Sequence, residues 1–106
     1  LAIENSQLYE KTVMLANMDS LTELWNHGYF QYLLQTELEK SRAKQKPLSL
    51  TMIDIDDFKH INDTWGHLCG NFVLTKIAGK LNAEMRKVDI VARYGGDEFA
   101  ILIKHK

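Results

Sequence analysis

The stretch DIVARYGGDEFAILIK, residues 89–104, decides the fold because it places two apolar runs on either side of a polar turn. Residues 89–94 and 98–104 are rich in the aliphatic and β-branched side chains that are typical of strands. The paired glycines Gly95 and Gly96 are typical of a two-residue hairpin turn, whose backbone needs positive φ angles. The segment therefore predicts an antiparallel hairpin that displays Asp97 and Glu98 at its tip.

A third strand is predicted upstream, over residues 48–55, and it ends in the acidic residues Asp54, Asp56 and Asp57. Because a buried carboxylate costs free energy, these side chains should emerge at a sheet edge, where ligands usually bind. A plainer interpretation makes Asp56 or Asp57 the cap of a following helix. If this strand lies beside the hairpin, both acidic ends converge and supply the hard oxygen ligands that Mg²⁺ prefers.

The rest of the chain is predicted to be mostly helical, with loops at Gly and Pro residues. The expected helices cover residues 1–18, the segment from the Asn26 cap to just before Pro47, residues 56–65 and residues 72–85. Gly66 and Gly70 are expected to bracket a loop. Alternating helices and strands predict an α/β (α+β) domain whose sheet is covered by helices. Since the sequence stops directly after a strand, we expect the domain to continue beyond Lys106.

Composition narrows the function classes. The 106 residues contain 13 Lys and Arg against 14 Asp and Glu, which gives a net charge of −1. That balance excludes a non-specific nucleic-acid coat protein. Cys69 is the only cysteine, and no apolar run approaches the roughly 20 residues that span a bilayer. We therefore expect a cytoplasmic protein with no membrane segment in this chain and no nucleic-acid partner.

The heptapeptide Arg93–Phe99 resembles the signature of GGDEF-domain diguanylate cyclases, which join two GTP molecules into cyclic di-GMP. Further matching motifs lie upstream at residues 19–22, 54–56, 58–59, 61–64 and 66–67. The resemblance implies a nucleotidyl-cyclase-like fold with a ferredoxin-like sheet, truncated at its C-terminus. Residues 19–106 would form the N-terminal portion of the domain. Residues 1–18 would form a signalling or linker helix, similar to the closing helix of GAF sensor domains.

The resemblance also implies a divalent metal site holding Mg²⁺ or Mn²⁺. Its ligands would be the carboxylates of Asp54 and Asp97 and the backbone carbonyl of Ile55. Asp97 and Glu98 are the candidates for the base that deprotonates the attacking 3′-hydroxyl. Lys59 would face the developing phosphate charge, where a compact cation stabilises the transition state.

Two more groups of residues follow from the same resemblance. Asn62, His67 and Asn71 would bind the substrate, with Asn62 at the guanine edge. Arg86 and Asp89, which end five residues before the hairpin glycines, would form an inhibitory product site for cyclic di-GMP. Without that context, the Arg-x-x-Asp spacing is typical of a surface ion pair.

Several positions depart from the family pattern. Asn71 stands where the family usually has Asp, and its NH₂ group spoils a bidentate grip on guanine. Glu23, Trp25 and His27 replace the usual Gly, Pro and Arg in the entry turn. The preferred function is a homodimeric cyclase that pairs through its N-terminal helix, of which this segment alone should be inactive. The alternatives are a non-catalytic module that binds GTP or cyclic di-GMP and a synthase of mixed purine cyclic dinucleotides.

Overall fold

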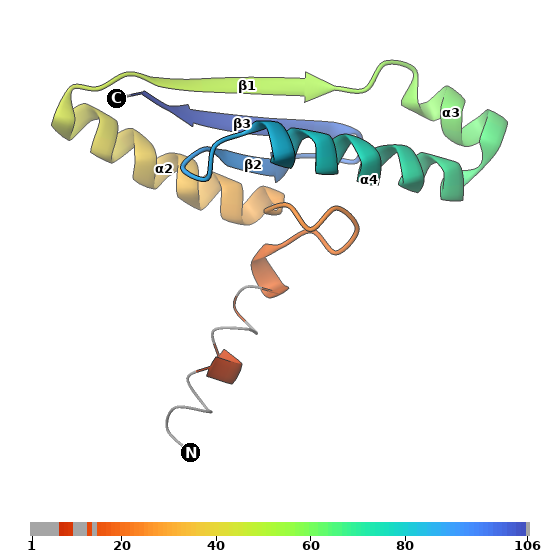
Figure 1. The fold of residues 1–106 in the computed structure, drawn as a ribbon, viewed down its shortest axis with the longest axis horizontal. Coiled ribbons are helices and arrows are strands. Elements are labelled where there is room, and N and C mark those ends of the chain that lie inside the picture. The colour runs from red at the N-terminus through yellow and green to blue at the C-terminus, as the bar shows by residue number, and fades with distance from the viewer. Residues whose placement is uncertain (1–6, 10–12, 14, 106) are drawn as a thin grey trace.

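The computed structural model describes residues 7–9, 13 and 15–105. Its regular elements follow one another along the chain as two helical regions separated by a long strand, then a β-hairpin (Figure 1). They are α2 (His27–Lys44), β1 (Leu48–Asp54), α3 (Phe58–Trp65), α4 (His67–Glu84), β2 (Ile90–Arg93) and β3 (Glu98–Lys104).

The three strands form one antiparallel sheet in the order β1-β3-β2. The central strand β3 therefore pairs with both of its neighbours. Asp54 lies opposite Glu98 at one end of the β1–β3 ladder, and Leu48 lies opposite Lys104 at the other. This register confirms the prediction that residues 48–55 lie beside the hairpin and bring both acidic ends to the same edge.

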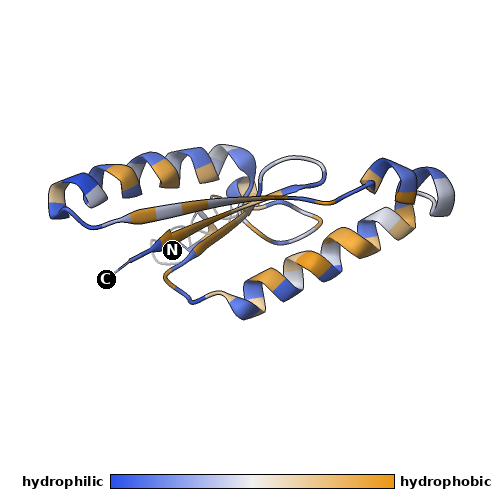
Figure 2. Cartoon of the chain, turned by 90° about the horizontal axis from the view of Figure 1, so that it is seen from above, coloured by the Kyte–Doolittle hydropathy of each residue, from blue (hydrophilic) through white to orange (hydrophobic). Residues whose placement is uncertain are grey.

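Helices cover both faces of the sheet, with α2 on one side and α4 on the other (Figure 2). Successive side chains of a strand point to opposite faces of the sheet, so β3 contributes alternate residues to the interface with α2 and to the interface with α4. Phe99 and Ile101 pack in the cluster that contains Leu74 of α4, whereas Ala100 and Leu102 pack in the cluster that contains Phe30 of α2. The expected helix-covered α+β sheet is thus confirmed.

Helix α2 begins and ends as its sequence predicts. The Asn26 side chain accepts a hydrogen bond from the backbone N–H of Tyr29 at 2.9 Å, which caps the first turn. The helix stops at Lys44, and Gln45 follows in the left-handed conformation with a φ of 53°. This break comes two residues before Pro47, which disfavours a helical residue ahead of it.

The loop predicted between Gly66 and Gly70 is wrong. Helix α4 already starts at His67, and only Gly66, with a φ of 90°, separates it from α3. Gly70 lies within α4, where a Cβ atom would stand 1.8 Å from Oδ1 of Asn62. This glycine therefore allows two helices to approach closely and does not mark a turn.

The helix predicted over residues 1–18 lies partly outside the described residues. Residues 7–9, 13 and 15–17 are helical, and the side chains of Leu8 and Leu15 are exposed. Helicity ends at Met18, where a short bridge to Trp25 begins the entry turn. No helix among the described residues is both long and apolar enough to cross a membrane.

Candidate active site

The acidic end of the sheet brings Asp54 and Asp97 into contact. The backbone N–H of Ile55 donates to the carbonyl oxygen of Asp97 at 3.1 Å, which extends the β1–β3 pairing by one residue. Repulsion by the Asp97 carboxylate is the main reason that the pKa of Asp54 is raised above its ordinary value. Two residues that are 43 positions apart in sequence thus share one patch of negative charge.

The same patch is suited to a divalent cation. Within residues 7–9, 13 and 15–105, no three His, Cys, Asp or Glu side chains gather in a metal-holding arrangement. Asp54 and Asp97 supply two hard oxygen groups, and the carbonyl of Ile55 follows directly on the chain. Mg²⁺ is commonly held by one or two carboxylates, with phosphates and water completing its coordination. A bound cation would also offset the repulsion between the two carboxylates.

The cap interpretation of Asp57 is not supported. Asp57 does occupy the N-cap position of α3, but its backbone is left-handed with a φ of 55°. Within the described residues its side chain makes no capping hydrogen bond. Aspartate is among the few residues that adopt this conformation at modest cost. Asp57 therefore turns the chain sharply from the acidic strand end into α3.

The hairpin turn differs from the two-residue turn predicted for Gly95 and Gly96. Four residues, 94–97, connect β2 to β3, and neither glycine has a positive φ angle. Instead, a Cβ atom on Gly95 would lie 2.4 Å from Oε1 of Glu98. The carbonyl of Glu98 also accepts the N–H groups of Tyr94 and Gly95 at 2.8 and 3.2 Å. The Glu98 side chain thus folds back over Gly95, and a larger residue at this position would have to displace the end of that side chain.

Asn62 on α3 is a half-buried polar residue. Its Oδ1 atom is buried and has no hydrogen-bond partner among the described residues. It lies against the space that Gly70 leaves open. A buried polar atom without a partner costs free energy unless a ligand or water satisfies it. Asn62 thus has an unpaired acceptor at the position where a substrate-binding residue is predicted.

Three other candidate residues lie on exposed helix positions. Lys59 is in the first turn of α3, His67 is the first residue of α4, and Asn71 is one turn further along α4. The structure gives none of these side chains a contact with Asp54 or Asp97 in the described part of the chain. Asn71 follows Gly70 directly in α4, and it is exposed.

Arg86 and Asp89 form a separate site. The Nε and Nη2 atoms of Arg86 donate to the two carboxylate oxygens of Asp89 at 3.0 and 2.8 Å, and Nη2 also donates to the Lys104 carbonyl at 2.7 Å. These hydrogen bonds are the main reason that the pKa of Asp89 is lowered. Only 4% of the Asp89 side chain is exposed, whereas 50% of the Arg86 side chain is, so the ion pair lies at the surface with its carboxylate covered. The two residues border a cavity of about 560 Å³ that also contacts Trp25.

The sequence did not reveal an ion pair between the entry turn and the hairpin. Nη1 of Arg93 lies 3.1 Å from Oδ1 of Asp19, and Nη2 donates to the carbonyl of Gly96 at 2.8 Å. Burial raises the pKa of Asp19, but hydrogen bonds from Thr22 and the charge of Arg93 outweigh it and lower the pKa overall. Both residues were visible in matching motifs, but their 74-residue separation concealed the contact.

Comparisons with known proteins agree with this geometry. A family model described as diguanylate cyclase, GGDEF domain, matches residues 16–106. The chain is 43% identical over 108 residues to diguanylate cyclase A of Treponema denticola and 34% identical over 100 residues to diguanylate cyclase DgcS of Shewanella oneidensis. These alignments cover 99% and 94% of this chain, but only 28% and 34% of those proteins. The chain thus spans about a third or less of the length of these relatives.

Solved structures give the same answer for the fold. The coiled coil and GGDEF domain of DgcB from Caulobacter crescentus, in complex with c-di-GMP, matches with a TM-score of 0.94 and 30% identity, over 99% of this chain and 55% of that chain. The GGDEF domain of TpbB from Pseudomonas aeruginosa matches with a TM-score of 0.77 and 43% identity, over 81% of this chain and 50% of that chain. With the family model matched along all but the first 15 residues, this chain belongs to the GGDEF-domain diguanylate cyclase family.

Proposed function

We propose that this chain is part of a diguanylate cyclase that condenses two GTP molecules into cyclic di-GMP and pyrophosphate. The observation that carries the proposal is the contact between Asp54 and Asp97, because two adjacent carboxylates are suited to hold the cation of a bound triphosphate. Relatives named diguanylate cyclases support it. Diguanylate cyclases of this family generally need a divalent metal ion.

In the proposed site, Asp54, Asp97 and the Ile55 carbonyl hold Mg²⁺ or Mn²⁺. When bound, the cation supplies charge neutralisation to the triphosphate and lowers the pKa of the attacking 3′-hydroxyl. Lys59 faces the phosphates, while Asn62, His67 and Asn71 hold the guanosine. The carboxylate of Asp97 or Glu98 takes the proton of the 3′-hydroxyl.

Two domains, each with one bound GTP, must face each other for the reaction to form the cyclic dinucleotide. Each 3′-oxygen forms a bond to the partner's α-phosphorus, the bond to the β-phosphate oxygen breaks, and pyrophosphate leaves. Placement and charge neutralisation therefore dominate the rate. We infer a cytoplasmic homodimer that pairs through the N-terminal segment, which the presence of a coiled coil with the GGDEF domain in the DgcB structure supports by analogy.

Product identification tests the proposal. The protein, extended beyond both ends of this segment, is incubated with Mg²⁺ and GTP, ATP or both, and the products are identified by mass spectrometry. Cyclic di-GMP from GTP alone is the expected result. Asp97→Ala should reduce the rate by roughly a hundredfold or more, because it removes a charged group from the reacting centre. Glu39→Gln, an exposed change on α2, should leave the rate unchanged. Turnover retained in Asp97→Ala would remove the role assigned to this residue.

The same assay separates the alternatives that Asn71 raises. A mixed dinucleotide formed only with both substrates would identify a synthase of mixed purine products. Tight binding of GTP or cyclic di-GMP without turnover would identify a non-catalytic regulatory module. Product inhibition is proposed to act at Arg86 and Asp89, so Arg86→Ala should need more cyclic di-GMP for half-inhibition while its initial rate stays the same.

A further inference from the structure

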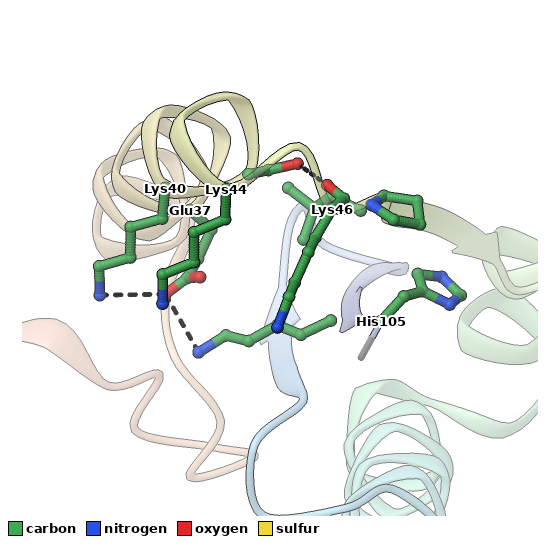
Figure 3. A pocket seen from close by; sticks show the side chains of 9 residues that line it. Glu37, Lys40, Lys44, Lys46 and His105 are labelled. Carbon is green, nitrogen blue, oxygen red and sulfur yellow. Dashed lines mark hydrogen bonds and ion pairs between the residues drawn. The ribbon is translucent and has the colours of Figure 1, made fainter.

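A second pocket lies at the opposite end of the sheet from the acidic residues. Figure 3 shows this pocket from close by. It has a volume of about 240 Å³ and sits where α2 ends, β1 begins and β3 ends. Four of its nine lining residues are lysines, namely Lys40, Lys44, Lys46 and Lys104, and one is an acid, Glu37.

The pocket concentrates positive charge in a chain that is slightly negative as a whole. Four lysine ammonium groups line it against one carboxylate, so its net charge is 4 − 1 = +3 with His105 neutral. The whole chain carries −1. The lysines come from three places: Lys40 and Lys44 from α2, Lys46 from the following turn, and Lys104 from β3. Like charges from separate elements repel each other unless an anion lies among them.

Glu37 neutralises only part of this charge. Its carboxylate lies 3.1 Å from Nζ of Lys104 and 3.8 Å from Nζ of Lys40, and the residue is 8% exposed. No carboxylate of the described residues lies within ion-pair distance of Lys44 or Lys46. Figure 3 shows Lys40, Lys44 and Lys46 extending to the same side of the junction as Glu37. The ammonium groups of Lys44 and Lys46 thus remain without an ion-pair partner among the described residues.

The backbone around the pocket is held in place by hydrogen bonds. Gln45 ends α2 in the left-handed conformation, and its N–H donates to the carbonyls of Arg42 and Ser41. The Ser41 hydroxyl donates to the carbonyl of Lys46. Across the pocket, the Ser49 hydroxyl and Nε2 of His105 lie 2.7 Å apart. These bonds fix the turn that carries Lys46 relative to the end of α2.

A helix C-terminus attracts cations, which explains Lys44 without any ligand. It does not explain Lys46, which lies outside the helix, or Lys104, which arrives from the sheet. The pocket volume of about 240 Å³ is below the roughly 300–1,000 Å³ of sites for drug-sized ligands. Its occupant should therefore be compact and carry several negative charges.

We propose that this pocket binds a small diphosphate-bearing anion, which is held chiefly by the ammonium groups of Lys44 and Lys46. Phosphate oxygens accept hydrogen bonds from lysine as from a point charge, and these charge-assisted bonds are stronger than neutral ones. Free pyrophosphate and the diphosphate of a nucleotide present the same chemistry. The site is separate from the proposed active site, because it lies at the other end of β3.

Isothermal titration calorimetry with inorganic pyrophosphate tests the proposal. The buffer is freed of divalent cations with a chelating resin, so that any metal-dependent binding at Asp54 and Asp97 is suppressed. The expected result is saturable binding to one site that weakens as salt is added. Asp54→Asn with Asp97→Asn should leave this binding intact. Loss of binding in that variant would place the anion at the acidic end and overturn the proposal.

Matched charge changes locate the binding. Lys44→Gln with Lys46→Gln should weaken pyrophosphate binding by roughly a hundredfold, about tenfold for each lost charge-assisted bond. Lys76→Gln with Lys80→Gln removes the same charge from α4 and should change the affinity little. Equal weakening in both variants would mean non-specific attraction. A separate titration with GDP in the same buffer distinguishes free pyrophosphate from a nucleotide diphosphate, since preference for GDP would identify the nucleotide as the source.

Glu37→Gln gives a result of opposite sign. Glutamine keeps the side-chain shape but removes the negative charge that occupies Lys104 and Lys40, so pyrophosphate should bind more tightly. A purely structural carboxylate would not produce this gain, and weaker binding in a folded Glu37→Gln variant would contradict the proposal. Binding to vesicles with anionic headgroups, with no response to pyrophosphate, would likewise replace the small-anion site by a membrane contact.

Discussion

At the scale of single residues, two glycines of α4 meet different surroundings. Gly70 faces Oδ1 of Asn62 at 1.8 Å from the position of a Cβ atom, whereas nothing lies within 4 Å of that position at Gly79. We expect Gly70→Ala to destabilise the protein by about 1–3 kcal/mol, because the new methyl group must displace Asn62. Urea denaturation measures the change.

The corresponding substitution at Gly79 should increase the stability of the protein. Gly79→Ala lies in the same helix and should stabilise it by about 0.5–1 kcal/mol, because alanine loses less backbone entropy on folding. If both alanines stabilise the protein, the close approach of α3 and α4 at Gly70 is not a constraint on this fold.

Asn71 is the residue at which substrate binding can be improved. An aspartate would offer two acceptor oxygens to the N1–H and amino group of guanine, where Asn71 offers one acceptor and a competing donor. In the proposed cyclase, Asn71→Asp should lower the KM for GTP by roughly tenfold and reduce any use of ATP. Steady-state kinetics measure both values. Lys80→Gln changes the net charge of α4 equally and should leave the KM unaltered; an unchanged KM in Asn71→Asp would remove this residue from the base-binding site.

At the scale of elements, the entry turn contains a residue in an unfavourable conformation. Glu23 has a φ of 61°, in the left-handed region that glycine tolerates and other residues adopt at a cost. Glu23→Gly should therefore stabilise the protein by up to about 1 kcal/mol. The control is Glu39→Gly within α2, which should destabilise by about 1 kcal/mol. Thermal unfolding of both variants checks the signs, and a loss of stability in Glu23→Gly would contradict this account.

Comparison of the predicted and observed elements shows which of them the sequence patterns predict correctly. The residues 98–104 strand was predicted with its correct ends, because Glu98 and Lys104 bound an uninterrupted apolar run. The prediction of a loop between Gly66 and Gly70 was wrong because the sequence alone does not distinguish a glycine that allows close packing from a glycine in a turn. The prediction that Gly95 adopts a positive φ angle in a two-residue turn was wrong for the same reason. Local propensity cannot distinguish these uses, since the deciding contact comes from Asn62 or Glu98.

At the scale of the whole molecule, acid stability depends on carboxylates held by arginines. The pKa values of Asp19 and Asp89 are lowered from 3.8, so their contribution to stability is fully present above about pH 3.8 and is lost as pH falls through the lower folded values. We expect Asp89→Asn to be less stable than the wild type at neutral pH, with a difference that shrinks below pH 3.8. Urea denaturation across pH 2–7 measures it.

The control for this prediction is an exposed carboxylate. Asp63→Asn on α3 should lower the stability little. A constant difference between Asp89→Asn and the wild type down to the lowest pH would show that the Arg86–Asp89 bond is not sensitive to protonation.

The candidate site was predictable to the extent that sheet register is predictable. The convergence of Asp54 and Asp97 follows once residues 48–55 pair with the hairpin, and the structure confirms that pairing. The Asp19–Arg93 contact and the basic pocket were not predicted, because they depend on how separate elements meet in space. The roles assigned to Lys59, His67 and Asn71 stay predictions.

The central strand β3 fixes the distance between the acidic end and the lysine-rich end of the sheet. Glu98 begins it beside the acidic pair and Lys104 ends it beside the lysine cluster, so a seven-residue strand sets a separation of roughly 20 Å. A slip of β3 by two positions would preserve which side chains are buried, yet it would draw Glu98 away from Asp54 and Lys104 away from Glu37 together. Selection on either end therefore restrains the other, and a loosened register should reveal itself at both ends at once.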